Sequence, residues 1–330
     1  MPDPGERIAV VVPAFRVKAQ IGQVLAAIGP EVAAIYVVDD ACPEGSGDLV
    51  EASVSDPRVR VLRHERNRGV GGATLTGYRQ ALADGLDVIV KLDGDGQMDP
   101  GRIADLVRPI LEDEADYVKG NRFFDLEGLR PMPKVRLIGN ALLSFVTKLS
   151  TGYWHLFDPT NGFTAIDARV AAMLPLGKLS EGYFFESDVL FRLGTLRAVV
   201  QDVPMPARYG SEQSGLAPSR VAAEFLRKHA ANTAKRIFYG YYLRDFNIAS
   251  LELLLGPLFL GIGTIVGVMG WTRSHVAGEF ASSGTVMLAA LPILLGVQLL
   301  LAFFGYDLQN VPREPLRRRL GRRSGREPSP

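Results

Sequence analysis

The amino-acid sequence predicts an α/β fold: a mostly parallel sheet with helices on both faces, followed by amphipathic helices and two membrane-spanning helices. Three observations predict it. Short β-branched runs alternate with helical stretches from Ile8 to about Gly215. These runs are continuously apolar, which is typical of parallel strands that are covered on both faces. Two later segments of 19 residues each are almost wholly apolar, which is long enough to cross a bilayer.

Local pattern predicts the individual strands and helices of the front portion. Runs rich in Val and Ile predict strands, and the stretches between them have a length that fits crossover helices. The expected strands are Ile8–Phe15, Ala34–Asp39, Val59–Arg63, Asp87–Leu92 and Tyr117–Lys119, with an edge strand inside Val199–Gly210, and the expected helices are Ala19–Ile28, Gly47–Ser53, Gly71–Asp84 and one from Arg136 to about Ser150. Right-handed crossovers bring the strand ends to one edge of the sheet, so a ligand is expected there.

Composition divides the chain into four parts. Residues 1–215 form the α/β domain, and residues 216–248 form basic amphipathic helices that lie on an anionic membrane surface or pack on a core. Residues 249–305 form a hairpin whose spans are Leu251–Met269 and Val286–Phe304, the alternative being two buried helices of a soluble domain. Residues 306–330 form an Arg-rich tail that is expected to be disordered.

Charge predicts how the hairpin is oriented. Residues 216–248 hold six basic against two acidic side chains, and the chain after Phe304 holds seven arginines against three acidic side chains. Arg273 and Glu279 cancel in the connector. Since positive flanks stay in the cytoplasm, we expect a multi-pass protein of the cytoplasmic membrane with both termini in the cytosol. Gly263 and Gly267 form a GxxxG pattern, which favours helix–helix contact and is compatible with a homo-oligomer.

Several function classes are excluded. The net charge of +1 excludes a globally basic nucleic-acid-binding protein. The single cysteine, Cys42, can form neither an internal disulfide nor a thiolate zinc site. No GxGxxG follows the first strand, and no P-loop motif is present, which argues against a Rossmann dehydrogenase and a P-loop enzyme.

An acidic loop follows the fourth expected strand. Asp93 and Asp95 are separated by one glycine, and Gln97 adds a neutral oxygen two residues later. Two carboxylates at this spacing suit a hard divalent cation, Mg²⁺ or Mn²⁺, which would neutralise charge on a leaving diphosphate. The alternative is an ordinary Asp-Gly turn between strand and helix.

Residues at the ends of the other expected strands resemble the motifs of a known family. The first strand closes with Pro13-Ala14-Phe15, the second with Asp39-Asp40, and the third leads to Arg68-Gly69 in a Gly-rich turn. Together with the acidic pair, this ordered set resembles the family-2 glycosyltransferases with the GT-A fold. The resemblance implies that Pro13, Ala14 and Phe15 line a nucleobase pocket, that Asp39, Asp40, Arg68 and Gly69 bind the nucleotide sugar, and that Asp93 and Asp95 hold a metal on its diphosphate. Arg16-Val17 replaces the family's usual Asn-Glu, which leaves UDP and GDP both open.

The next segments resemble a subgroup of that family. Arg122 follows the fifth strand, Arg136 and Asn140 lie on the next helix, and Asp158-Pro159-Thr160-Asn161-Gly162 comes after it. This order is similar to the polyprenyl-phosphate glycosyltransferases, the subgroup that includes dolichol-phosphate mannose synthase. The resemblance implies that Arg122 and Arg136, with Asn140, bind a lipid phosphate, whose oxygens a guanidinium matches. Surface ion pairs are the alternative for both arginines.

Four further residues have two interpretations each. Glu186 and Asp188 are general bases if the acceptor is a sugar hydroxyl, and helix-capping or orienting residues if it is a phosphate. We favour the second, because a phosphate already carries an oxyanion at pH 7. Asp158 resembles a family aspartate near the reaction centre, or else it caps a turn. Arg208 lies in a Gly/Ser-rich stretch that is either a lid over the diphosphate or a linker.

The sequence therefore predicts an inverting, metal-dependent hexosyltransferase in cell-envelope glycan synthesis. Its expected partners are a nucleotide-diphosphate sugar, a polyprenyl phosphate and the bilayer, and nucleic acid is not among them. A UDP-glucose-like donor is favoured and GDP-mannose stays open. The alternatives are a transferase that acts on a sugar hydroxyl and a non-catalytic membrane scaffold. A processive polysaccharide synthase would carry a Gln-x-x-Arg-Trp motif, which this chain lacks.

Overall fold

The computed structural model describes residues 6–124, 134–206 and 218–321, with the side chains of 134–137 and 218–221 left out. The chain forms two compact units. Unit 1 comprises Met1–Thr233 together with Pro312–Pro330, and unit 2 comprises Ala234–Val311. Each unit is described by itself.

Unit 1 is built on a seven-stranded sheet with the order β3-β2-β1-β4-β6-β5-β7. The strands are β1 (Ile8–Ala14), β2 (Val32–Asp39), β3 (Val59–Arg63), β4 (Val88–Lys91), β5 (Tyr117–Asn121), β6 (Thr164–Asp167) and β7 (Val200–Pro204). Only β6 runs antiparallel to its neighbours, β4 and β5, within this sheet. The expected α/β fold with a mostly parallel sheet is therefore confirmed.

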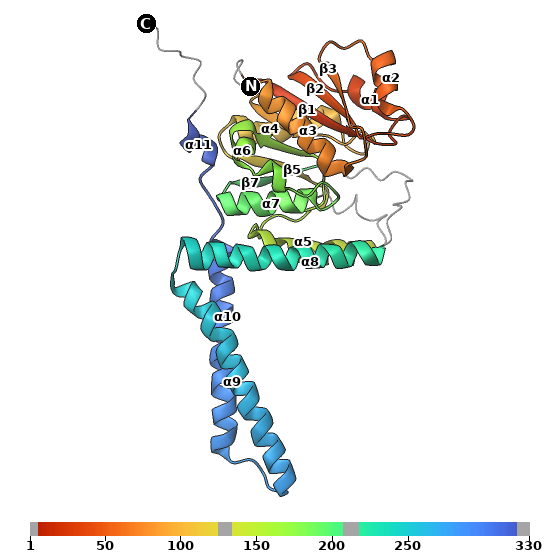
Figure 1. Cartoon of the computed structure of the whole chain (residues 1–330). Helices are drawn as coiled ribbons and strands as arrows, with labels where there is room; N and C mark the ends of the chain where they lie inside the picture. Colours follow the sequence, from red (N-terminus) through yellow and green to blue (C-terminus); the bar gives the residue numbers. More distant parts are fainter. Residues whose placement is uncertain (1–5, 125–133, 207–217, 322–330) are drawn as a thin grey trace. The chain divides into compact units, whose positions relative to one another are not determined.

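Helices cover both faces of this sheet (Figure 1). The even-numbered residues of β1, such as Val10, join a core with α1 (Ile21–Ala26), α2 (Ser46–Ser53) and α4 (Ile103–Leu111). Val11 points to the other face, where it lies against Gly77 of α3 (Gly69–Ala83). The helices α6 (Ala168–Met173), α7 (Phe185–Leu196) and α5 (Lys134–Thr151) follow on that side, and α5 packs on α7. Two short 3₁₀ helices, η1 (Pro100–Arg102) and η2 (Leu176–Lys178), complete the unit's described connections.

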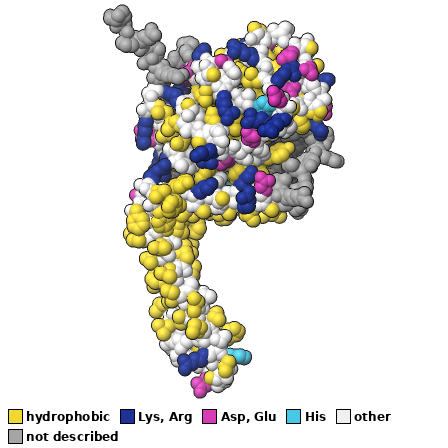
Figure 2. Space-filling model, in the orientation of Figure 1, with side chains coloured by type: hydrophobic (Ala, Val, Ile, Leu, Met, Phe, Trp, Pro, Cys, Tyr) yellow, Lys and Arg dark blue, Asp and Glu magenta, His cyan; other side chains and the backbone are white. Residues whose placement is uncertain are grey.

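Unit 2 is a helical hairpin. The helix α8 (Pro218–Ile237) continues into it and is followed by the π-helix η3 (Phe238–Arg244), α9 (Ile248–Ala277) and α10 (Ser283–Gln309). The helices α9 and α10 lie side by side (Figure 1) and have mean hydropathies of 2.0 and 2.5 over their most apolar windows, so both are long and apolar enough to cross a membrane. Many hydrophobic side chains lie along the hairpin's visible surface, and charged side chains appear only at its far tip (Figure 2).

Glycines bring the two hairpin helices into close contact. A Cβ on Gly263 would lie 2.7 Å from the carbonyl oxygen of Ala289, and one on Gly296 would lie 2.7 Å from that of Gly256. Gly263, the first glycine of the GxxxG pattern, thus lets α9 pack closely on α10 within one chain. A Cβ on Gly267 would meet Ala289 at 3.4 Å, which is an ordinary contact.

The chain re-enters unit 1 after the hairpin. We expected disorder from residue 306, but α10 extends to Gln309 and a short helix, α11 (Leu316–Leu320), follows. The side chain of Arg317 is only 1% exposed and forms ion pairs with Glu6, Asp113 and Asp167. Glu6 lies before β1, Asp113 lies before β5, and Asp167 ends the antiparallel β6. All three acidic side chains therefore lie at the edge of the sheet opposite the carboxyl ends of the parallel strands. Residues 322–330 of the expected tail lie outside the described residues.

Candidate active site

The turns after β1 and β2 meet at the carboxyl edge of the sheet. The amide of Asp40 donates to the carbonyl of Ala14 at 3.1 Å, and the amide of Arg16 donates to Sγ of Cys42 at 3.1 Å. Arg16 and Ala41 both have a positive φ, of 57° and 52°, so the loops after β1 and β2 both turn sharply here. Pro13 and Ala14 belong to the strand end and Ala14 is buried, while the next residue, Phe15, is 39% exposed at the edge.

Asp39 and Asp40 both hold backbone amides. Oδ1 and Oδ2 of Asp39 accept hydrogen bonds from the amides of Cys42 (2.7 Å) and Gly47 (2.8 Å). Asp40 accepts from the amides of Arg68 (2.8 Å) and Gly69 (2.7 Å) at the start of α3. These bonds shape both loops, and a role of either carboxylate in binding a nucleobase stays a prediction.

The Gly-rich start of α3 packs directly on another segment's backbone. Gly69 has a φ of +83°, and a Cβ there would lie 2.7 Å from the carbonyl oxygen of Glu181. The guanidinium of Arg68 forms an ion pair with the side chain of Glu181. His64 adds a second support, because its Nδ1 lies 2.7 Å from Oδ1 of Asp40 and its Nε2 lies 2.8 Å from the Thr76 hydroxyl.

The acidic loop begins at Asp93, two residues after the end of β4. Asp93 is 28% exposed at its side chain, and its Oδ1 accepts a hydrogen bond from Nζ of the buried Lys91 at 2.7 Å. Oδ1 of Asp95 accepts from the amide of Gln97 at 3.0 Å, and Gly96, with a φ of +77°, makes the turn between them. The two carboxylates and the Gln97 amide are hard oxygen donors at the edge of the sheet.

This donor set fits Mg²⁺ or Mn²⁺. Within the described ranges, no group of three or more His, Cys, Asp or Glu side chains is placed to hold a metal ion. A magnesium ion needs fewer protein ligands than that, because it is usually held by one or two carboxylates while water and substrate phosphates fill its other positions. An open site with two carboxylates therefore suits an ion that a diphosphate completes.

Arg122 and Asp158 form a forked pair. Nε and Nη2 of Arg122 donate to Oδ2 and Oδ1 of Asp158 at 2.8 and 3.0 Å, and the amide of Arg122 adds a third bond. Burial alone would raise the pKa of Asp158, but the hydrogen bonds from Arg122 and the charge of Lys119 lower it below its usual value. Asp158 is therefore an ionised, buried carboxylate that fixes the guanidinium.

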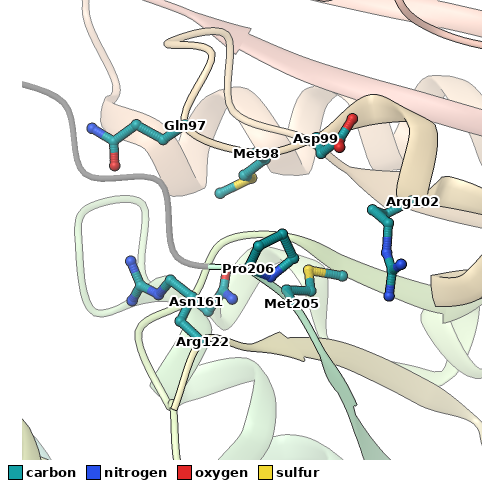
Figure 3. A pocket seen from close by; sticks show the side chains of 8 residues that line it. All are labelled: Gln97, Met98, Asp99, Arg102, Arg122, Asn161, Met205 and Pro206. Carbon is teal, nitrogen blue, oxygen red and sulfur yellow. The ribbon is translucent and has the colours of Figure 1, made fainter. Parts of the chain in front are cut away.

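One pocket connects the acidic loop with this pair. Its lining includes Gln97, Met98 and Asp99 from the loop after β4, Arg122 and Asn161, and Met205 and Pro206 after β7 (Figure 3). In this view the side chains of Gln97 and Arg122 lie on one side of the pocket and Arg102 on the other (Figure 3). The structure thus brings Gln97, an expected metal ligand, and Arg122, an expected phosphate ligand, to the same cavity.

Other expected phosphate-binding residues are only partly described. Asn140 is half-buried on α5. Arg136 lies in the first turn of α5, but its side chain is not among those described. Arg208 lies outside the described residues altogether.

Glu186 and Asp188 are buried on the first turns of α7 and have partners there. Oε1 of Glu186 lies 3.0 Å from Nζ of Lys91. Oδ2 of Asp188 accepts from the amide of Ser180 at 3.0 Å, and its Oδ1 lies 3.7 Å from Nε of Arg192. Both carboxylates are therefore held in ion pairs and hydrogen bonds.

Comparison with known proteins identifies the family. A sequence profile described as Glycosyl transferase family 2 matches residues 9–173, half of the chain. The chain belongs to glycosyltransferase family 2. It is 32% identical over 173 residues to an undecaprenyl-phosphate mannosyltransferase of Micrococcus luteus, covering 52% of this chain and 70% of that protein. It is 34% identical over 152 residues to a UDP-N-acetylglucosamine–dolichyl-phosphate N-acetylglucosaminyltransferase of Methanococcus voltae, covering 46% of this chain and 60% of that protein.

A solved structure shows that this glycosyltransferase has the GT-A fold. Glucosyl-3-phosphoglycerate synthase from Mycobacterium tuberculosis, in complex with Mn²⁺, UDP and phosphoglyceric acid, superimposes with a TM-score of 0.54 at 20% identity. The match covers 72% of this chain and 79% of that one.

Sequence reasoning missed four residues that support the site. Lys91 donates to the Asp93 carboxylate, and Gly162 lies where a Cβ would collide with both of these side chains. His64 and Glu181 hold the loop around Asp40 and Arg68. Lys91 carried a usable signal, because a lysine in the otherwise apolar run of β4 must find a charged partner when it is buried. The contacts of the other three residues depend on the tertiary fold, and no spacing in the sequence predicts them.

Proposed function

We propose that this glycosyltransferase moves a hexose from a nucleotide-diphosphate sugar to a polyprenyl phosphate, with inversion at the anomeric carbon. The pocket that joins Gln97 to Arg122 carries the proposal. A transfer between two anionic substrates needs partners for both phosphate groups around one reaction centre. The named activities of the Micrococcus and Methanococcus proteins, which concern lipid phosphates, support the same acceptor class.

The donor side is formed by the ends of β1, β2 and β4 and the start of α3. Asp93, Asp95 and Gln97 would hold Mg²⁺ or Mn²⁺, which supplies neutralising charge for the leaving diphosphate. The neighbour crystallised with Mn²⁺ and UDP supports this assignment. A UDP-hexose, UDP-glucose first, is the favoured donor, with GDP-mannose as the alternative. The expected donor contacts are Pro13, Ala14, Phe15, Asp39, Asp40, Arg68, Gly69 and Arg208.

On the acceptor side, Arg122 and Arg136, with Asn140, bind the lipid phosphate. An oxygen of that phosphate forms the bond to the anomeric carbon as the bond from this carbon to the diphosphate oxygen breaks, and the nucleoside diphosphate leaves. No general base is needed, because the acceptor is already an oxyanion at neutral pH. The ion pair of Glu186 with Lys91 and the contacts of Asp188 agree with orienting roles. Asp158 keeps the Arg122 fork in place.

The protein acts at the cytoplasmic face of the membrane, with α9 and α10 as its spans. Their length and hydropathy support this placement. Within unit 1, Ile138, Leu142 and Phe145 are exposed at helical spacing on α5, as expected for a face that touches lipid. The basic face of α8 suits an anionic leaflet. A lipid phosphate would then meet the site at the headgroup level.

The deciding experiment is a transfer assay with the purified full-length chain. The reaction contains Mg²⁺, undecaprenyl phosphate and one of UDP-glucose, UDP-N-acetylglucosamine or GDP-mannose, and the lipid-linked sugar is extracted and identified by mass spectrometry. We expect transfer from one of these donors, and we expect Asp93→Asn to lower its rate at least about 100-fold because the diphosphate loses its metal. Asp105→Asn, a surface carboxylate on α4 paired with Arg102, is the matched control and should retain transfer. Transfer to sugar hydroxyls, with none to the lipid phosphate, would contradict the proposal.

A further inference from the structure

Lys91 is a fully buried cation that binds the Asp93 carboxylate from within the sheet. Its side chain is 1% exposed, and its Nζ donates to Oδ1 of Asp93 at 2.7 Å. The same Nζ lies 3.0 Å from Oε1 of Glu186 and 3.4 Å from the carbonyl oxygen of Gly162. The ammonium group is thus enclosed by two carboxylates and a carbonyl oxygen, all of which accept hydrogen bonds.

Gly162 closes the other side of the same carboxylate. A Cβ at this position would lie 2.5 Å from Oδ2 of Asp93 and closer still to Nζ of Lys91. No side chain fits there while Lys91 and Asp93 keep their contact. The loop that carries Gly162 also carries Asp158 and Asn161, which contact Arg122 and the carbonyl of Gly120. The backbone of this loop therefore holds the Asp93 carboxylate in one orientation.

We propose that Lys91 and Gly162 are positioning residues that make Asp93 a one-oxygen ligand and so select a small octahedral cation, Mg²⁺ or Mn²⁺, over Ca²⁺. Since Lys91 occupies Oδ1, a cation on this carboxylate is held through Oδ2. Ca²⁺ accepts six to eight oxygens and often takes both oxygens of a carboxylate, whereas Mg²⁺ requires six ligands in near-ideal geometry. Freeing Oδ1 removes the restriction that disfavours Ca²⁺. This inference rests on the proposed metal site.

A ratio of affinities separates positioning from simple charge repulsion. The positive charge of Lys91 weakens the binding of every divalent cation by a similar amount, so its electrostatic contribution cancels when Ca²⁺ and Mg²⁺ are compared. A change in the orientation of Asp93 does not cancel, because the two ions differ in how they use a carboxylate. The ratio of the two dissociation constants is therefore the quantity that reports on the proposed role.

The test uses the full-length chain in detergent, without substrate. Bound Mn²⁺ is measured by the electron paramagnetic resonance signal of the free ion, and it is displaced by Mg²⁺ or by Ca²⁺. We expect Lys91→Met to shift the ratio of dissociation constants toward Ca²⁺ by about tenfold, the lower end of what outer-shell changes do to metal affinity. Gly162→Ala should shift it in the same direction, because its Cβ displaces the carboxylate from the lysine.

The control is Lys119→Met on β5. Lys119 is as buried as Lys91, but its Nζ makes no hydrogen bond to a described residue, and Asp93 is not among its partners. This variant removes a buried charge and should leave the ratio unchanged. Cooperative unfolding on heating shows that a variant is folded. If Lys91→Met does not unfold cooperatively, the ratio of dissociation constants measured for Gly162→Ala decides whether the positioning role holds.

The outcomes distinguish two failures. Retained Mn²⁺ binding with an unchanged ratio in the folded Lys91 and Gly162 variants would overturn their positioning role and leave the metal site intact. Equal Mn²⁺ binding by the wild type and Asp93→Asn would overturn the metal site and this inference together.

Discussion

The buried Asp158 and the half-buried Asp202 both interact with Lys119, yet their pKa values shift in opposite directions. Hydrogen bonds from Arg122 and the charge of Lys119 outweigh the burial of Asp158 and lower its pKa below 3.8. Burial dominates at Asp202 and raises its pKa above 3.8, although Lys119 and the amide of Phe157 act against it. The number of charge-assisted donors thus decides which carboxylate is firmly ionised.

Asp158→Asn should destabilise unit 1 by about 1.5–3 kcal/mol at pH 7, since the forked bond to Arg122 loses its charge. A lowered pKa in the folded state gives stability that is present above pH 3.8 and lost as the pH falls through the folded value. The difference in melting temperature between wild type and variant should therefore shrink below about pH 4. Thermal unfolding of the detergent-solubilised chain from pH 7 to 3 measures it.

Asp202→Asn is the matched comparison. A raised folded-state pKa gives stability that is present below pH 3.8 and lost as the pH rises through the folded value. Relative to wild type, this variant should therefore become more stable with rising pH. Parallel pH profiles of the two variants would contradict the assignment.

Residue patterns predicted the chemical groups of the site better than their contacts. The spacing of Asp93, Asp95 and Gln97 is local, so the acidic loop could be found in the sequence. The fork between Arg122 and Asp158 spans 36 residues and depends on where β5 ends beside the loop before β6. A resemblance to a family named both residues, but only the fold shows that one holds the other.

At the scale of elements, long apolar runs were the most predictable part of the fold. The six expected strands correspond to β1, β2, β3, β4, β5 and β7. The ends of the first five differ from the expected ones by at most two residues, and β7 lies inside the expected stretch. The strand β6 was not predicted, because its four residues, Thr-Ala-Ile-Asp, are too short to carry a pattern. The helices α4, α6 and α7 were also not predicted. The Arg-rich tail was expected to be disordered because of its composition. The structure places the short helix α11 there, and the acidic partners of Arg317 lie about 150 to 310 residues earlier in the chain, where no local pattern reveals them.

The docking of α11 can be tested with two neighbouring arginines. Arg317→Ala removes the ion pairs with Glu6, Asp113 and the buried Asp167, and it should destabilise unit 1 by roughly 3–5 kcal/mol, as expected for breaking a buried ion pair. Arg319→Ala removes a side chain that is 64% exposed and pairs with Glu314 at the surface, so it should leave the melting temperature nearly unchanged. Equal melting temperatures of the two variants would show that the tail does not dock in solution.

At the scale of the whole molecule, the chain leaves unit 1 after Thr233 and returns to it at Pro312. Both ends of the apolar hairpin are therefore tied to the same unit. This connectivity agrees with the positive charge on both flanks of the hairpin, which predicts that the catalytic unit and both flanks share the cytoplasmic side. In the proposed function, this hairpin is the membrane anchor of a GT-A enzyme whose proposed acceptor is a lipid phosphate.

We propose that Asp93 and Asp95 hold a divalent cation at the edge of the sheet where the donor diphosphate binds. Anomalous diffraction from crystals of the full-length chain grown with Mn²⁺ and either UDP or GDP tests it most directly. We expect a manganese peak about 2.1 Å from carboxylate oxygens of both residues, bridged to the diphosphate. A nucleotide bound at this edge with its manganese away from both carboxylates would contradict it.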